Sequence, residues 1–317
     1  MNEQKKHVAV IGCGYWGKNL IKAFAGLGVL AAVSDAHAPT AESFAAQYDC
    51  AALSWDEVLA DRNITAVALA TPAVLHAKMA TEALNAGKHV FVEKPLALTV
   101  PDAEKVIALA KQQNRFLMVG HILNYHPAFM KLKQMVDEGA LGRVRHVISN
   151  RLSLGKVRHE EDVLWSFAPH DLSMILSLAG SEPVKIAVSK SAILQEGIAD
   201  IGHIDLTFAN DVTAHVHVSW ISPFKEQKLT VIGDKAMAVF EDSLAYPDKL
   251  RLYPHLVDAS KTPPTVEKKD FITIDVVESE PLRNECAHFI NCISNNQQPI
   301  TDGEEGLCVL RILAQTS

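Results

Sequence analysis

Residues 7–17 of the chain read His-Val-Ala-Val-Ile-Gly-Cys-Gly-Tyr-Trp-Gly, a short apolar run followed at once by a glycine-rich turn. The apolar run has the length of a buried β-strand, and residues 18–27 have the apolar spacing of a helix that ends at Gly28. A G-x-G-x-x-G turn between a strand and a helix is the context that a dinucleotide site requires. The stretch therefore predicts the first strand, turn and helix of a Rossmann fold.

The three glycines of this turn have separate roles in such a site. Gly12 permits the tight turn, and Gly14 lets the backbone approach a pyrophosphate at the helix N-terminus. Gly17 lets the helix and the strand pack closely. The two aromatic residues between them, Tyr15 and Trp16, belong to the same loop, so we count them with the glycines as cofactor-binding candidates.

A second strand, over residues 30–34, ends in Asp35, eighteen residues past Gly17. A carboxylate at this position can accept hydrogen bonds from both hydroxyls of an adenosine ribose. Its charge would repel a 2′-phosphate, so Asp35 predicts NAD rather than NADP as the cofactor.

Strands and helices continue to alternate as far as residue 121. Helical patterns cover 38–48, 54–61, 73–86 and 101–113, and apolar strands cover 64–70, 89–92 and 116–120. Strands joined by right-handed helical crossovers form a doubly wound parallel sheet. We therefore expect residues 1–121 to form an NAD-binding Rossmann domain.

Residues 87–95 read Gly-Lys-His-Val-Phe-Val-Glu-Lys-Pro. The strand over 89–92 would hold Lys94 at its carboxyl end, which is where open α/β sheets bind their ligands. A partly buried amine there can exchange protons near neutrality, while Glu93 can steer it and Pro95 stiffens the turn. An isolated loop lysine is usually a solvated cation. This lysine follows a nucleotide-binding half, so Lys94 is our first catalytic candidate.

The second half of the chain has a different periodicity. Alternating runs cover 144–154, 184–193, 201–209, 212–221, 228–233 and 236–241, after a helix over 128–138. Such alternation describes a mainly antiparallel sheet with one face on a core. The fold class is thus α/β, with an N-terminal Rossmann sheet and, over 122–317, a C-terminal α+β domain with a large open sheet. Its terminal helical patterns, 281–295 and 304–315, can pack back on the first domain.

A second chemical stretch lies between the predicted strands. Residues 163–172 read Val-Leu-Trp-Ser-Phe-Ala-Pro-His-Asp-Leu and open a helical pattern that runs to residue 179. Pro169 favours a first helical turn, which would place His170 near the helix N-terminus. There the helix dipole disfavours an imidazolium and so favours a neutral base. The alternative is that His170 is a capping or core residue.

Three stretches together carry a resemblance to a known family. They are the glycine turn at 12–17, the strand 64–72 (Ile-Thr-Ala-Val-Ala-Leu-Ala-Thr-Pro) followed by His76, and 86–95, which ends in Glu-Lys-Pro. They resemble the glucose-fructose oxidoreductase / inositol dehydrogenase / rhizopine catabolism (Gfo/Idh/MocA) family over essentially the whole chain. The resemblance implies that Thr71, Pro72 and His76 lie beside the nicotinamide half of the cofactor, Glu93 beside its ribose and Lys94 at the reacting carbon. Without the family, His76 reads as a packed or solvated histidine.

The same resemblance implies a chemistry for the two catalytic candidates. In the family a histidine at the position of His170 helps to remove the hydroxyl proton, commonly with an aspartate four residues earlier, where this chain has Ser166. Alcohol oxidation passes a hydride to the nicotinamide and the hydroxyl proton to a base. We assign the base to His170 and the stabilisation of the developing alkoxide to Lys94, although the two roles can be exchanged.

Finer similarity suggests the substrate. Residues 120–127, 151–158 and 163–171 are similar to the branch of the family that oxidises carbon 3 of UDP-linked N-acetylhexosamines, whose products feed an aminotransferase that gives 3-amino sugars for lipid A or O-antigen. UDP-N-acetylglucosamine and its 6-uronic acid both fit. Basic side chains suit a diphosphate or carboxylate, and a tyrosine can stack on a sugar or base. The substrate-binding candidates are Tyr125, Arg151, Lys156, Arg158, Trp165 and His170. A mobile basic loop is the alternative for the three cations.

Histidines on two neighbouring predicted strands, His203 with His215 and His217, resemble a metal site at first sight. Exposed strand faces often carry such residues and no supporting pattern accompanies them, so we predict no metal. In the family, open sheet faces pair between subunits. The resemblance therefore implies a homodimer or homotetramer through this face.

Composition limits the remaining possibilities. The net charge is −7 and no basic run occurs, which argues against nucleic acid and anionic membranes as partners. The N-terminal apolar run is too short for a signal or a membrane span, so the expected location is the cytoplasm. The five cysteines are scattered and odd in number, as in a reduced protein. The rival functions are a ketosugar reductase or polyol dehydrogenase on the same fold, and a non-enzymatic NAD-binding regulator.

Overall fold

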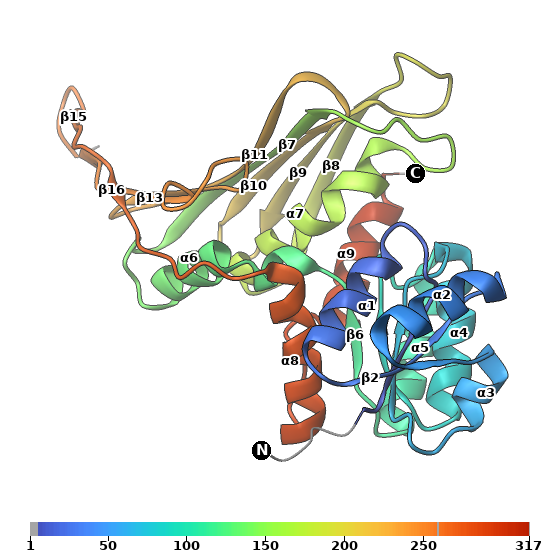
Figure 1. Ribbon diagram of the computed structural model, residues 1–317. Coiled ribbons are helices and arrows are strands. Elements are labelled where there is room, and N and C mark those ends of the chain that lie inside the picture. The colour runs from blue at the N-terminus through green and yellow to red at the C-terminus, as the bar shows by residue number, and fades with distance from the viewer. Residues whose placement is uncertain (1–5, 259, 317) are drawn as a thin grey trace. The chain divides into compact units, whose positions relative to one another are not determined.

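The computed structural model describes residues 6–258 and 260–316. The chain divides into two units (Figure 1). Unit 1 holds the residues up to Tyr125 together with Glu280–Ala314, and unit 2 holds His126–Ser279 with residues 315 and 316.

Unit 1 is built on a parallel sheet with the strand order β3-β2-β1-β4-β5-β6. The pairings of its described strands are all parallel. The strands are β1 (Val8–Ile11), β2 (Leu30–Ser34), β3 (Ala51–Ala52), β4 (Ala66–Leu69), β5 (His89–Val92) and β6 (Leu117–Val119). The central strands are continuously apolar because helices cover both faces of such a sheet. This order is that of dinucleotide-binding folds, which confirms the predicted Rossmann sheet.

Helices surround this sheet, as the prediction required. They are α1 (Gly17–Gly26), α2 (Ala38–Tyr48), α3 (Trp55–Ala60), α4 (Ala73–Asn85), α5 (Val100–Gln112), the 3₁₀ turn η1 (Ile122–Tyr125), α8 (Pro281–Asn295) and α9 (Gly303–Ala314). The sequence assigned the last two to the second domain while allowing them to pack back. In the structure α8 packs on α1 and η1, and α9 packs on α5 and β6 (Figure 1). Cys286, Phe289 and Ile290 of α8 join the same apolar core as Phe24 and Phe91.

Unit 2 contains an eight-stranded sheet with the order β16-β13-β12-β11-β7-β10-β9-β8. Its strands are β7 (Val144–Leu154), β8 (Pro183–Ser191), β9 (Ile201–Phe208), β10 (Thr213–Ser219), β11 (Ile221–Gly233), β12 (Met237–Glu241), β13 (Leu250–Tyr253) and β16 (Ile272–Thr273). Among the described pairings of this sheet, β7 with β10 is parallel and the others are antiparallel. The predicted mainly antiparallel sheet is therefore confirmed. A separate hairpin pairs β14 (Leu256–Asp258) with β15 (Thr265–Glu267).

Two helices of unit 2 pack against its sheet. They are α6 (Pro127–Asp137), which contacts β12, and α7 (Val163–Ala179), which contacts β7, β9 and β10. Along β10 the side chains of Ala214, Val216 and Val218 are buried, whereas His215 and His217, on the other face of the strand, are only half-buried. The period of two in the sequence thus separates a core face from an outer face. The helices in the described part of the chain are too short or too polar to span a bilayer.

Candidate functional site

A cavity of about 500 Å³ lies at the carboxyl edge of the sheet in unit 1, where β1, β2 and β4 end. Its lining includes five of the predicted cofactor-binding residues: Gly12, Gly14, Asp35, Thr71 and Pro72. In this strand order the winding of the sheet reverses between β1 and β4, and ligands of open α/β sheets bind at that reversal. The structure therefore brings these separated stretches together in one place.

The glycine turn has the geometry that each of its glycines was predicted to supply. Gly12 has a φ of +92°, and a Cβ atom there would lie 2.7 Å from the carbonyl oxygen of Ala70. A Cβ atom on Gly17 would lie 1.8 Å from the carbonyl oxygen of Gly12, which no side chain can tolerate. A Cβ atom on Gly14 would meet nothing within 4 Å, so a ligand has room to approach the backbone at that point.

Asp35 is held at the end of β2 by the backbone. The amide of Cys13 donates to its Oδ2 at 2.7 Å, and the amide of His37 donates to its Oδ1 at 2.9 Å. Each carboxylate oxygen has further acceptor capacity, so the group can also receive both hydroxyls of a ribose. The glycine turn, the cavity and this carboxylate together fit the adenosine and pyrophosphate of NAD.

The two aromatic residues of the turn, Tyr15 and Trp16, differ in their contacts. Tyr15 is 87% exposed, and the Lys18 ammonium lies 5.3 Å from the centre of its ring. The Trp16 indole N–H instead donates to Oε1 of Glu93, which follows β5. This bond ties the loop after β1 to the loop that carries Lys94.

Glu93 lies at the carboxyl end of β5, directly before Lys94. A Cβ atom on Gly120 would come within 3.0 Å of its Oε2, so the carboxyl group occupies space that a glycine leaves open. Burial raises the pKa of Glu93 to about 7, against the opposing effects of the Trp16 hydrogen bond and the charges of Lys94 and His121. Unit 1 therefore places a carboxyl group that titrates near neutrality beside the candidate lysine.

Glu285 on α8 is a residue of this region that the sequence reasoning missed. It is 0% exposed, and neither carboxyl oxygen has a hydrogen-bond partner among the described residues. Burial, followed by the nearby charge of Glu93, raises its pKa well above the usual value for glutamate. The signal was available, because Leu282, Glu285, Cys286 and Phe289 share the i, i+3, i+4, i+7 spacing of a buried helical stripe.

As the pH rises, the free energy of unfolding of Glu285→Gln is expected to increase relative to that of the parent protein. The raised pKa means that the folded state holds this proton more tightly than the unfolded state does, so its stabilising effect is complete below pH ~4.3 and declines above it. The decline is at most about 1.4 kcal/mol per pH unit until the folded pKa is reached. Glutamine has no proton to lose, so the variant escapes this decline.

Urea unfolding midpoints measured between about pH 5 and pH 8 test this expectation. The matched control is Glu42→Gln, because Glu42 is an exposed glutamate on α2 of the same unit. Its midpoints should run parallel to those of the parent protein. Parallel curves for Glu285→Gln as well would show that Glu285 holds no proton in the folded state.

His76 lies on α4 and is 1% exposed. Its Nδ1 is 2.7 Å from the carbonyl oxygen of Pro95, and its Nε2 is 2.8 Å from the carbonyl oxygen of Thr71. The ring does not belong to the cavity lining, although Thr71 does. The sequence left two interpretations of His76, a residue beside the nicotinamide and a packed histidine. Its burial and its two backbone contacts are typical of the packed histidine.

In unit 2 the helix that carries His170 begins earlier than expected. α7 starts at Val163, and Asp162 caps it by accepting from the amides of Leu164 at 3.0 Å and Trp165 at 3.1 Å. Pro169 therefore lies inside the helix, and His170 is two turns away from its N-terminus. The prediction that the dipole at a helix N-terminus keeps His170 neutral was wrong, because that effect is confined to the first turn.

Arg151 on β7 makes a buried ion pair with the residue that follows His170. Its Nε donates to Oδ2 of Asp171 at 2.6 Å and its Nη2 donates to Oδ1 at 3.2 Å. Ser149 adds a third bond to Asp171, which is 1% exposed. Two of the guanidinium nitrogens are thus committed to Asp171, so the contacts seen here are those of a structural ion pair rather than of a substrate ligand.

The other substrate-binding candidates fall in different environments. Tyr125 is 1% exposed in unit 1, and its hydroxyl lies 2.9 Å from Oγ1 of Thr301. A ring buried in this way cannot stack on a sugar, so that prediction was wrong. Arg158 pairs with Glu161 at 3.2 Å, Lys156 is exposed, and Trp165 is half-buried on α7. Lys94 belongs to unit 1 and His170 to unit 2.

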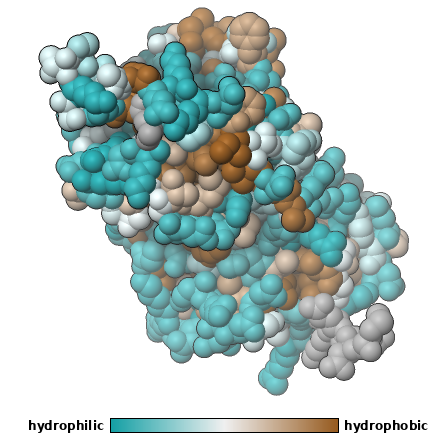
Figure 2. All heavy atoms as spheres, turned by 90° about the vertical axis from the view of Figure 1, so that its left-hand side faces the viewer, coloured by the Kyte–Doolittle hydropathy of each residue, from teal (hydrophilic) through white to brown (hydrophobic). Residues whose placement is uncertain are grey.

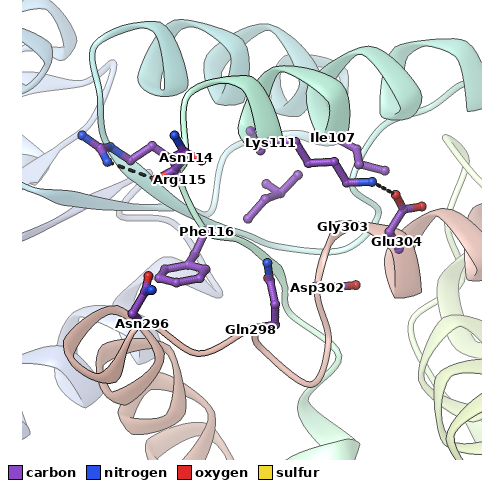
Figure 3. A pocket seen from close by; sticks show the side chains of 12 residues that line it. Ile107, Lys111, Asn114, Arg115, Phe116, Asn296, Gln298, Asp302, Gly303 and Glu304 are labelled. Carbon is purple, nitrogen blue, oxygen red and sulfur yellow. Dashed lines mark hydrogen bonds and ion pairs between the residues drawn. The ribbon is translucent and has the colours of Figure 1, made fainter.

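A second cavity of unit 1, of about 380 Å³, lies between α5, α9 and the start of β6 (Figure 3). The Lys111 ammonium reaches across to Glu304, and Phe116, Asn296 and Gln298 line it from another side. It holds none of the predicted site residues and lies at the amino end of β6. The cavity at the carboxyl edge therefore remains the candidate site.

Comparison with known proteins finds two family models that match the chain. Residues 6–121 match the model of an oxidoreductase family with an NAD-binding Rossmann fold (GFO_IDH_MocA), and residues 129–239 match that of the GFO/IDH/MocA C-terminal domain. UDP-N-acetylglucosamine 3-dehydrogenase of Acidithiobacillus ferrooxidans is 29% identical over 96% of this chain and 94% of its own length. Its solved structure superposes with a TM-score of 0.85 at 27% identity, covering 98% of this chain and 96% of that one. Inositol 2-dehydrogenase of Rhizobium meliloti is 28% identical over 96% of this chain and 93% of its own length.

Proposed function

The chain belongs to the GFO/IDH/MocA oxidoreductase family, and on that premise we propose that it oxidises the 3-hydroxyl of a UDP-N-acetylhexosamine to the 3-keto sugar. The family makes it an NAD-dependent dehydrogenase of the CH–OH group. The proposal for the substrate is supported by the similarity to a UDP-N-acetylglucosamine 3-dehydrogenase along nearly the whole of both chains. UDP-N-acetylglucosamine and its 6-uronic acid are the two candidates.

The observation that carries the proposal is the arrangement within unit 1. The cavity beside Asp35 and the glycine turn lies at the same sheet edge as Lys94, which follows the neighbouring strand β5. When bound, NAD supplies the acceptor for the hydride of the alcohol carbon. The chain's own residues have to handle the hydroxyl proton: His170 accepts it and Lys94 hydrogen-bonds the oxygen, or the two exchange these roles.

A direct assay tests this function. The protein is incubated with NAD and, in separate reactions, UDP-N-acetylglucosamine, its 6-uronic acid, UDP-glucose and myo-inositol, and reduced cofactor is followed by absorbance. We expect reduction with one of the two N-acetylated nucleotide sugars. Oxidation at carbon 3 gives a ketone, so an added aminotransferase with an amino donor should convert the product to a 3-amino sugar. Lipid A or O-antigen synthesis uses such 3-amino sugars. Turnover of UDP-glucose alone would refute the proposed substrate class.

Polyol oxidation is the second candidate function. The similarity to inositol 2-dehydrogenase spans nearly the whole of both chains and is almost as high as that to the nucleotide-sugar enzyme. Reduction of NAD by myo-inositol but by neither nucleotide sugar would select this alternative. A ketosugar reductase would oxidise NADH with its own keto sugar and would give no reduced cofactor with any of the four alcohols.

Association through the outer face of the unit 2 sheet is a further part of the proposal. His203, His215 and His217 stack there, with ring centres 4.4 Å and 5.6 Å apart. Ile148 of β7 lies beside His215 in the register and is half-buried. Figure 2, a view from the side of the β14–β15 hairpin in Figure 1, shows that apolar residues reach the surface among polar ones. Sedimentation should give a dimer or tetramer that Ile148→Glu dissociates, and a monomeric parent protein would exclude this association.

A further inference from the structure

One buried ring connects the two loops that carry the candidate chemistry of unit 1. Thr71 follows β4 and lines the cavity, and Pro95 follows Lys94 after β5. His76 reaches the backbone carbonyl of each, at 2.8 Å from Thr71 and 2.7 Å from Pro95. Because β4 and β5 are adjacent strands, the imidazole lies between the two loops that follow them.

The chemistry of the ring makes this contact more specific than packing. A neutral imidazole has a single N–H and can donate to one carbonyl at a time, whereas an imidazolium donates to both. Burial lowers the pKa of His76, and the two carbonyls act in the opposite direction. An apolar side chain of the same size would remove the N–H donor altogether, which is costly for a part-buried backbone carbonyl.

We propose that His76 is a positioning residue that fixes the Lys94–Pro95 turn against the Thr71 loop and thereby holds the Lys94 amine in its working place. The proposal rests on the proposed function, because it assumes that Lys94 acts in the reaction. It differs from a cofactor contact, since the ring lies outside the cavity lining and meets the loops through their carbonyl oxygens. The Lys94 backbone is one residue from the Pro95 carbonyl that His76 contacts.

The test compares His76→Phe, which keeps a ring without donors, with His76→Gln, which keeps an amide donor. In His76→Phe we expect kcat to fall by about 30-fold or more, because small displacements of a reacting group are costly. The KM for NAD should stay within about threefold, because the glycine turn and Asp35 are untouched. His76→Gln should recover most of the lost kcat. The matched control is His89→Gln, since His89 accepts from the Phe116 amide at the opposite end of β5.

A second measurement does not depend on any sugar. Pyridoxal 5′-phosphate forms imines with lysine amines, borohydride reduces them, and peptide mapping reports the labelling rate of each lysine. We expect His76→Phe to change the labelling rate of Lys94 at least about fivefold as the turn loosens, and to leave the exposed Lys22 of α1 unchanged. His89→Gln should leave both rates as in the parent protein.

Each outcome decides the matter. A rise in KM for NAD that matches the whole loss of kcat/KM would make His76 a cofactor contact and overturn the proposal. Unchanged kcat and unchanged Lys94 labelling in His76→Phe would overturn it as well. If His76→Phe does not fold, His76→Ala, which also removes both ring nitrogens, must show the altered labelling of Lys94, while His76→Gln should label close to the parent protein. A parent protein that oxidises no sugar refutes the proposed function, whereas the labelling still decides the role of His76.

Discussion

Lys94→Ala is expected to lower kcat by about 10²–10⁴-fold at saturating NAD, the usual contribution of a positioned acid–base or oxyanion group. The side chain follows β5 at the sheet edge that holds the cofactor cavity. The variant should bind NAD as the parent protein does, because Asp35, Gly12 and Gly14 line the cavity without help from Lys94. Steady-state kinetics with the sugar that the NAD-reduction assay identifies measure kcat. NADH binding, followed by fluorescence, measures the affinity for the cofactor.

The control for this variant is Lys105→Ala, which removes an exposed lysine of α5 from the same unit. It should leave kcat unchanged. If Lys94→Ala stays within about tenfold of the parent protein, a loss of only ~1.4 kcal/mol, then Lys94 has no chemical role. His170→Ala measured alongside separates the two assignments, because the variant that has lost the base also loses the acidic limb of the pH–rate profile.

Arg151→Ala is expected to lower the free energy of unfolding by about 3–5 kcal/mol, the cost of leaving one member of a buried ion pair without its partner. Asp171 is 1% exposed and would lose the bonds from Nε at 2.6 Å and Nη2 at 3.2 Å. The Ser149 hydroxyl, 2.6 Å from Oδ1, would still donate to Asp171. Urea unfolding of the full chain, followed by circular dichroism, measures the loss.

Two further variants calibrate this result. Arg143→Ala breaks a surface pair with Asp211, whose side chain is 84% exposed, and should cost no more than about 1 kcal/mol. The double variant Arg151→Met/Asp171→Leu removes both charges and should recover most of the stability. A cost below about 1 kcal/mol for Arg151→Ala, together with a raised KM for the nucleotide sugar, would restore the substrate-binding role predicted from the sequence.

The cofactor half of the site could be predicted because its determinants are local. A Cβ atom at position 12 would lie 2.7 Å from the carbonyl oxygen of Ala70, so the turn needs glycine there. The acidic residue at the end of the second strand is likewise visible in the sequence of the motif. The position of Lys94 at this sheet edge could be predicted in the same way, because only Glu93 separates it from the end of β5. In motifs made of contiguous residues, the residue types themselves indicate the local backbone conformation.

The environment of His170 could not be predicted in the same way. Pro169 suits a first helical turn, but the Asp162 cap starts α7 two turns earlier, and a proline inside the helix is accepted there. Tyr125 illustrates the same difficulty. Its hydroxyl forms a hydrogen bond with Thr301, which is distant in the sequence, and no residue near Tyr125 indicates that contact. Both interpretations failed where a distant or competing contact decided the outcome.

The sequence by itself determined the two sheets, the NAD-binding edge and the lysine that follows β5, because apolar periodicity and glycine sterics act over a few neighbouring residues. Only the tertiary structure decided that Glu285 is buried near Glu93, that Arg151 is paired with Asp171, and that His76 spans the carbonyls of Thr71 and Pro95. The physical reason is that charge burial and hydrogen-bond pairing depend on which surfaces meet in space. The packing of helices on sheets decides which surfaces meet. A local pattern can indicate that a residue such as Glu285 is buried, but it does not identify the residue's partner.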